Sequence, residues 1–152
     1  MKIEIAGKGG SGKSTITALI AKSMVKKGYK VLVIDGDESN SGLHRHLGLQ
    51  LPEDFMNSVG GKWRVSQKMM KAMIPNARKL SKGEIGAHEI SIPIFEKKLR
   101  ISEISKAYLS EKNGISLLAV GKIHTAGKGC ACPMGALTKE LLNNRSWAGT
   151  KW

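Results

Sequence analysis

Two short stretches of the sequence combine residue types that could bind a charged ligand. The first, "GKGGSGKST" from Gly7 to Thr15, has the spacing G-x-x-x-x-G-K-[ST]. This spacing is typical of a loop whose backbone N–H groups surround phosphate oxygens while a lysine and a hydroxyl reach the outer phosphates and Mg²⁺. The second, "GKGCACPMG" at 127–135, contains both cysteines of the chain, Cys130 and Cys132.

The first stretch predicts a phosphate site for ATP and Mg²⁺. We expect Lys13 to reach the β and γ oxygens and the Ser14 hydroxyl to bind Mg²⁺, because the loop leads directly into a helix N-terminus. A carboxylate in "DGD", Asp35 to Asp37, could orient an attacking water or a Mg²⁺-bound water. An aspartate pair that caps a turn is the alternative for this stretch. The expected phosphate-binding residues are Gly7, Gly9, Gly10, Ser11, Gly12, Lys13, Ser14 and Thr15.

The cysteine pair predicts half of a metal site. Two thiolates are too few to enclose a soft metal ion, and C-x-C spacing is too short for an unstrained bridge, which favours metal or redox chemistry. A two-fold axis would double two thiolates to four, a set that suits Zn²⁺, Ni²⁺ or an iron–sulfur cluster. Two unrelated buried thiols are the alternative.

A parallel sheet is the element expected to position both stretches. Strand, loop, helix and strand follow one another from residue 2 to residue 37, which is a βαβ unit and predicts an α/β fold. The cysteines follow a later strand, where open α/β sheets place their ligands. The expected strands are 2–6, 30–37 and 115–120. The expected helices start at Ser14, with Ile16, Leu19, Ile20 and Met24 on one face, and span a short segment before 48, then 63–73, 101–108 and 134–142, with a hairpin around 91–101.

The lysine that opens the loop adds a family resemblance. "GKGGSGKST", with Lys8 before the glycines, resembles the deviant phosphate loop of the dimeric ATPases that include nitrogenase iron protein and the septum-site and partition ATPases. The resemblance implies a P-loop NTPase three-layer sandwich with a mostly parallel sheet. It further implies that Lys8 crosses a homodimer to the other subunit's phosphates, that Asp37 orients the attacking water and that Asp35 lies nearer the Mg²⁺.

A narrower resemblance brings in the cysteines. Together, "GKGGSGKST", "VIDGDESN", "GLHRHLGL" and "GCACPMGAL" look like the ATPases related to the carbon monoxide dehydrogenase maturation factor, which delivers nickel. It implies that Cys130 and Cys132 from two chains hold one Ni²⁺ or Zn²⁺, with an iron–sulfur cluster as the weaker alternative, and that the client is a metalloenzyme such as carbon monoxide dehydrogenase. Competing hypotheses are a partition-type ATPase that binds DNA nonspecifically, an electron-transfer iron protein and an inactive fragment.

The length and the charge of the chain limit the number of domains and the class of protein that it can be. The 152 residues fit one domain, and the net charge of +13 comes mainly from residues 62–152, which we expect to be mostly a solvated face rather than a nucleic-acid site. No apolar run is long enough to span a membrane, and the N-terminus does not resemble a secretory signal, so we expect a cytoplasmic protein. The family's acid-containing strand is expected after residue 145, but residues 144–152 depart from that pattern. We therefore expect a partial domain, for which the sequence supports phosphate binding more strongly than it supports ATP hydrolysis.

Overall fold

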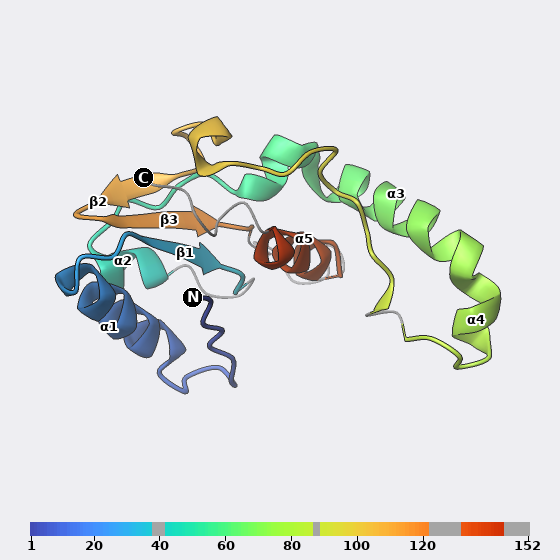
Figure 1. The fold of residues 1–152 in the computed structure, drawn as a ribbon, viewed down its shortest axis with the longest axis horizontal. Coiled ribbons are helices and arrows are strands. Elements are labelled where there is room, and N and C mark those ends of the chain that lie inside the picture. The colour runs from blue at the N-terminus through green and yellow to red at the C-terminus, as the bar shows by residue number, and fades with distance from the viewer. Residues whose placement is uncertain (38–41, 87–88, 122–131, 145–152) are drawn as a thin grey trace.

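The computed structural model describes residues 1–37, 42–86, 89–121 and 132–144. Three strands form one sheet in the order β1-β3-β2, and helices lie on both sides of it (Figure 1). The strands are β1 Val31–Asp35, β2 Ser110–Lys112 and β3 Ile115–Ala119. The helices are α1 Lys13–Lys26, α2 Leu43–Leu47, α3 Gly61–Met73, α4 Ala77–Ser81 and α5 Cys132–Asn143, with short 3₁₀ turns η1 Phe55–Val59, η2 Ile74–Asn76 and η4 Ile101–Glu103.

The central pair of strands is parallel. β1 and β3 pair in register from Val31 opposite Ile115 to Asp35 opposite Ala119, so their carboxyl ends lie at the same edge. β2 pairs with β3 antiparallel. The turn between β2 and β3 uses Asn113 at φ 51° and Gly114 at φ 79°. An Asn-Gly pair favours this hairpin because both residues tolerate positive φ.

Alternating side chains of the sheet enter two cores. One core joins the sheet to α1 and α2, and the other joins it to α3, α5 and η1. Leu117 and Leu118 illustrate the alternation, since they are both 0% exposed and belong to opposite cores. Helices on both faces of a sheet with a parallel pair make this an α/β three-layer fold, as expected from the sequence.

The long central segments were predicted correctly. The strands expected at 30–37 and 115–120 correspond to β1 and β3, and the short helix expected before residue 48 corresponds to α2. The helices expected at 63–73 and 134–142 correspond to α3 and α5. Among the described helices, none is long and apolar enough to cross a membrane.

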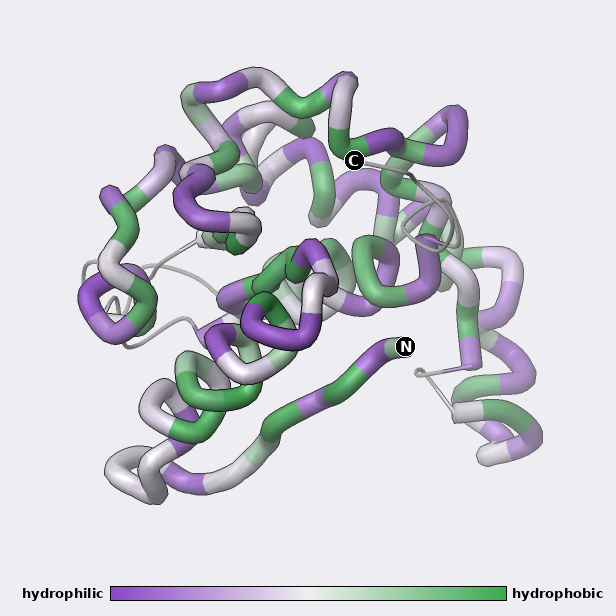
Figure 2. Tube along the Cα trace, turned by 60° about the vertical axis from the view of Figure 1, so that its left-hand side comes forward, coloured by the Kyte–Doolittle hydropathy of each residue, from purple (hydrophilic) through white to green (hydrophobic). Residues whose placement is uncertain are grey.

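The strand expected at 2–6 is absent. Residues 1–8 have no regular structure, and Figure 2 shows them as an extended trace in which hydrophobic and hydrophilic residues alternate. Ile3 is 52% exposed, and the Lys2 ammonium donates to the Leu142 carbonyl at the end of α5. Alternation predicts an extended conformation, but a strand also needs a neighbouring strand with which to pair. The sequence pattern gives no information about that neighbour.

The face of α1 that was expected to be buried is largely exposed. Ile16 is 48% and Leu19 is 63% exposed, whereas Ala18 and Ala21 are buried. The small side chains of the alanines face the core that α1 shares with α2 and the sheet. Choosing the face by hydrophobicity alone was therefore wrong, because the small side chains permit the closer approach.

Two expectations between residues 91 and 108 were also wrong. No hairpin forms around 91–101, and the helix expected at 101–108 is reduced to η4. Ile94, Ile101 and Ile104 are buried one by one in an irregular segment that crosses the α3–α5 core. Isolated apolar anchors at these spacings resemble a helical or strand period, although each residue is buried separately.

Candidate nucleotide and metal site

The predicted phosphate loop is a tight turn tied to the first residue of α1. Gly10 and Gly12 have φ of 76° and 81°, in the region that favours glycine. The Lys13 ammonium donates to the Lys8 carbonyl over 2.9 Å, and the Ser11 N–H donates to the same carbonyl over 3.3 Å. The structure thus brings together Lys8 and Lys13, the two lysines that the sequence singled out.

The start of α1 has the features of an anion site. Gly12 is the N-cap, no side chain caps the helix, and its first turn carries no acidic residue. The first N–H groups of a 14-residue helix are then available to an anion, which the helix dipole also favours. Nothing lies within 4 Å of a Cβ built at Gly9, Gly10 or Gly12, so the loop backbone is open to a ligand. Ser14 is half-buried in the first turn, and the phosphate group fits this cradle.

Gly12→Ala tests whether the left-handed conformation matters. An alanine at φ 81° costs about 1–2 kcal/mol, which for a chain of this size lowers Tm by roughly 2–8 °C and moves the loop backbone. The matched control is Gly9→Ala, where φ is not positive and the added Cβ meets nothing within 4 Å. Thermal unfolding followed by circular dichroism checks both variants. Equal Tm for the two would contradict the structure of the loop.

The aspartates of "DGD" lie at the carboxyl end of β1. Asp35 is buried, and its Oδ1 accepts a hydrogen bond from the Asp37 N–H over 3.1 Å. The Asp35 carbonyl accepts from the Val120 N–H over 2.9 Å, which extends the β1–β3 pairing past the strands. The Asp35 carboxylate therefore caps its own turn, the alternative that the sequence left open.

The structure does not bring the two halves of the predicted nucleotide site together. Figure 1 places the loop before α1 apart from the carboxyl end of β1. In a βαβ nucleotide site the first strand carries the loop to the edge of the sheet where the second strand ends. Residues 1–6 are outside the sheet here, so they do not form the strand that would carry the loop to that edge.

Helix α5 packs directly against the "DGD" turn. A Cβ built on Gly36 would lie 3.1 Å from Thr138 Cγ2 and 3.3 Å from Thr138 Oγ1. The Thr138 hydroxyl donates to the Met134 carbonyl over 2.8 Å, which fixes the side chain against α5. A larger residue between the two aspartates would therefore press against the Thr138 side chain, which would have to shift slightly. The sequence analysis missed this contact, since the pairing of Gly36 with Thr138 has no local pattern.

Cys132 is the first residue of α5 and is exposed. Its sulfur is disulfide-bonded in the structure, whereas the sequence predicted a metal ligand. Metal ligation requires the thiolate, so the predicted site applies to the reduced chain. Cys130 lies outside the described residues. Within those residues, no group of three or more His, Cys, Asp or Glu side chains could hold a metal ion.

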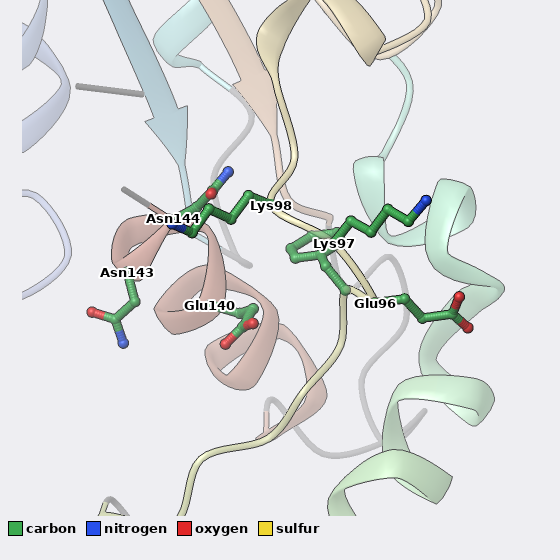
Figure 3. Close-up of a pocket in the computed structure, with 7 residues that line it drawn as sticks. Glu96, Lys97, Lys98, Glu140, Asn143 and Asn144 are labelled. Atoms are coloured by element: carbon green, nitrogen blue, oxygen red, sulfur yellow. The ribbon is translucent and has the colours of Figure 1, made fainter. Parts of the chain in front are cut away.

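A pocket of about 350 Å³ lies between the end of α5 and residues 95–98 (Figure 3). Burial raises the pKa of the Glu140 carboxyl that lines it, an effect that the Lys139 charge partly offsets. The Asn144 side-chain amide donates to the Leu99 carbonyl over 2.6 Å at the same place. The pocket contains neither the phosphate loop nor the "DGD" turn, so it is separate from the predicted nucleotide site.

An α/β sheet with a glycine-rich loop before a helix defines a nucleotide-binding protein of the P-loop class. Residues 3–118 match the CobQ/CobB/MinD/ParA nucleotide binding domain, and the chain belongs to this family. It is 49% identical over 144 residues to an uncharacterized ATP-binding protein of Methanocaldococcus jannaschii, a match that covers 95% of this chain and 52% of the relative. It is 32% identical over 146 residues to the carbon monoxide dehydrogenase accessory protein CooC of Rhodospirillum rubrum, covering 95% of this chain and 49% of that protein.

A third relative matches the chain over a shorter segment. An iron–sulfur cluster carrier protein of Clostridium perfringens is 49% identical over 45 residues, which cover 30% of this chain and 16% of that protein. The chain spans about half the length of the first two relatives. No solved structure matches.

Proposed function

We propose that this chain is the nucleotide-binding part of an ATP-dependent metallocentre maturation protein that loads nickel or a similar soft metal ion into a client enzyme. The family match covers ATP binding. The maturation role is supported by the likeness to a carbon monoxide dehydrogenase accessory protein and by the C-x-C pair. The observation that carries the proposal is the placement of Cys132 at the N-terminus of α5, the helix that packs against the "DGD" turn.

In this proposal the phosphate loop binds the triphosphate. The N–H groups at the start of α1 would donate to the phosphate oxygens. Lys13 would exchange its hydrogen bond with the Lys8 carbonyl for charged bonds to the β and γ oxygens. Ser14 and Asp35 would hold Mg²⁺ and its water. The bound metal–nucleotide complex would supply the reacting phosphate, while Asp37 would orient the attacking water.

The movement of the loop is the step that couples the two sites. In the structure the loop lies apart from β1, so nucleotide binding must carry residues 7–14 to the edge of the sheet before hydrolysis can occur. At that edge the turn from Asp35 to Asp37 contacts α5 through Gly36 and Thr138. A shift of the turn would therefore move the N-terminus of α5 and Cys132 with it.

Two copies of the chain would complete the metal site. Lys8 is exposed in the loop and would reach the phosphates held by the other copy, so ATP would hold the pair together. Cys130 and Cys132 from both copies would then offer four thiolates. The metal ion is the cargo, and it would pass to a client metalloenzyme when the pair separates.

The partition-type alternative rests on the basic residues of the second half. It would place nonspecific DNA on that surface, with binding that falls steeply as salt rises. It gives the cysteine pair no role, so we keep it as the alternative.

Oligomeric state and metal content together test the proposal. The reduced chain is loaded with Ni²⁺ and sedimented with and without ATP and Mg²⁺. We expect a monomer without nucleotide and a dimer with it, carrying about one metal ion per two chains. A chain that binds ATP but stays monomeric and metal-free would rule out the maturation role while leaving nucleotide binding in place.

A further inference from the structure

Helix α3 and the η2 turn that follows it carry an exposed apolar stripe that neither core uses. Trp63, Met70 and Ile74 are 73%, 62% and 68% exposed. Their spacing of seven and eleven residues places them in one row along a helix of 3.6 residues per turn. The buried side of α3 is a different face, where Val65 is 0% exposed and Met69 packs against the α3–α5 core.

A groove of about 270 Å³ runs beside this stripe. It lies between α3 and the start of α5, and both Trp63 and Cys132 line it. Three methionines of α3 line it, and methionine side chains adapt their shape to different partners. The other lining residues are Lys62, Ser66 and Pro133, with Met69, Met70 and Met73 as the methionines.

The other flank of the stripe is basic. Arg64 and Lys71 are seven residues apart, so they form a second row next to Trp63 and Met70, and both are exposed. Residues 61–82 contain no acidic side chain, and their basic residues are Lys62, Arg64, Lys68, Lys71, Arg78, Lys79 and Lys82. Lys68 is used internally, since its ammonium donates to the Ile94 carbonyl over 2.5 Å. Lys82 forms an ion pair with Glu84, whereas Arg64 and Lys71 are exposed on α3, the helix that extends beyond the sheet in Figure 1.

We propose that the surface formed by Trp63, Met70, Ile74, Arg64 and Lys71, with the adjoining groove, docks an acidic amphipathic helix of a partner protein. A helix laid into a groove inserts apolar anchors at helical spacing, and Trp63 and the methionines offer the matching surface. The acidic flank of such a helix would pair with Arg64 and Lys71. The identification of this partner as the client rests on the proposed function, because Cys132 is one of the residues that line the groove.

Charge and shape select this occupant over two others. A second copy of the chain would bring the same basic row against itself, which is repulsive across a two-fold axis. A membrane surface would use the apolar stripe and the basic row, but it gives no role to the groove beside them. A partner helix that is acidic on its flank uses the stripe, the groove and the charge together.

Fluorescence anisotropy with a designed peptide tests the proposal. The probe is a labelled amphipathic helix with leucines on one face and glutamates on both flanks. We expect Trp63→Ala to weaken binding roughly 30-fold and the double variant Arg64→Glu with Lys71→Glu to weaken it roughly tenfold. The control double variant, Lys26→Glu with Lys27→Glu, makes the same charge change at exposed positions at the end of α1 and should bind like the unaltered chain.

Further measurements distinguish a partner helix from the other molecules that could bind this surface. The proposal is overturned if the peptide does not bind, if the control variant weakens binding equally, or if phosphatidylglycerol vesicles or duplex DNA bind through the same residues in preference to the peptide. Self-association lost on Trp63→Ala would also overturn it in favour of a second copy. Lys13→Ala should retain peptide affinity, because α1 packs on the opposite core. A failed nucleotide site is thereby distinguished from a failed docking surface.

Discussion

Lys13→Ala is expected to weaken ATP binding roughly 100-fold while leaving the fold intact. Lysine to phosphate bonds are charge-assisted and contribute about 1.5–3 kcal/mol each, so losing two of them costs about 3 kcal/mol or more. In the structure the Lys13 ammonium donates to the exposed Lys8 carbonyl, and the loss of this side-chain hydrogen bond should cost little stability. Titration of a fluorescent ATP analogue gives Kd, and circular dichroism gives Tm.

The matched control for this variant lies on the same helix. Lys26→Ala removes an exposed lysine from the last turn of α1, where no phosphate is expected. It should leave Kd unchanged. If Lys13→Ala and Lys26→Ala bind ATP equally well, the loop is not the phosphate site of this chain, whatever its spacing. A fall in Tm of Lys13→Ala without a change in Kd would assign the lysine a structural role alone.

Sequence patterns were sufficient where the chemistry is local. The glycine spacing from Gly7 to Gly12 requires only the conformation of a few consecutive residues, and the structure has the positive φ values at Gly10 and Gly12 that such a loop needs. Strand β3, which is apolar except for Ser116, is buried throughout, as a strand covered on both faces must be. Each of these features is determined by neighbours in the chain.

The features that sequence missed depend on distant contacts. A strand at 2–6 could form only by pairing with a neighbouring strand, and no local sequence pattern specifies that neighbour. The close contact between Gly36 and Thr138 of α5 joins residues far apart in the sequence, so no local pattern predicts it either. Ile16 and Leu19 are hydrophobic enough to be core residues but are displaced from that role by Ala18 and Ala21. The Asn113–Gly114 hairpin is different, since its signal was present in the sequence and was not used.

These contacts also explain why the loop and the "DGD" turn are separate in the structure. Residues 1–6 connect to the folded chain through the Lys2 bond to α5 rather than through a strand ladder. The whole loop from Gly7 to Gly12 is exposed. An anion that binds both the α1 N-terminus and the sheet edge would offset the cost of ordering this segment. Nucleotide binding and folding of the N-terminal segment are therefore expected to be coupled.

Replacement of either cysteine by serine is expected to abolish metal binding by the ATP-bound dimer. With four thiolates from two chains, the reduced protein should hold about one Ni²⁺ per two chains. Cys132→Ser or Cys130→Ser removes two of the four at once because each substitution appears in both copies. The hydroxyl is a poor substitute for a thiolate on a soft ion, so occupancy should fall to near zero. Metal content is measured by mass spectrometry after gel filtration under reducing conditions.

A control variant and an oxidised sample show whether a loss of metal is due to the loss of the thiolates. Ser23→Ala changes an exposed side chain on α1 by one atom and should keep full occupancy. The unaltered chain, when oxidised, should lose the metal as completely as the serine variants, because Cys132 is then disulfide-bonded as in the structure. Full nickel occupancy in Cys132→Ser would place the metal elsewhere and end the case for a paired C-x-C site. Loss of metal with ATP-driven dimerisation retained would show that the phosphate loop, and not the metal, holds the two chains together.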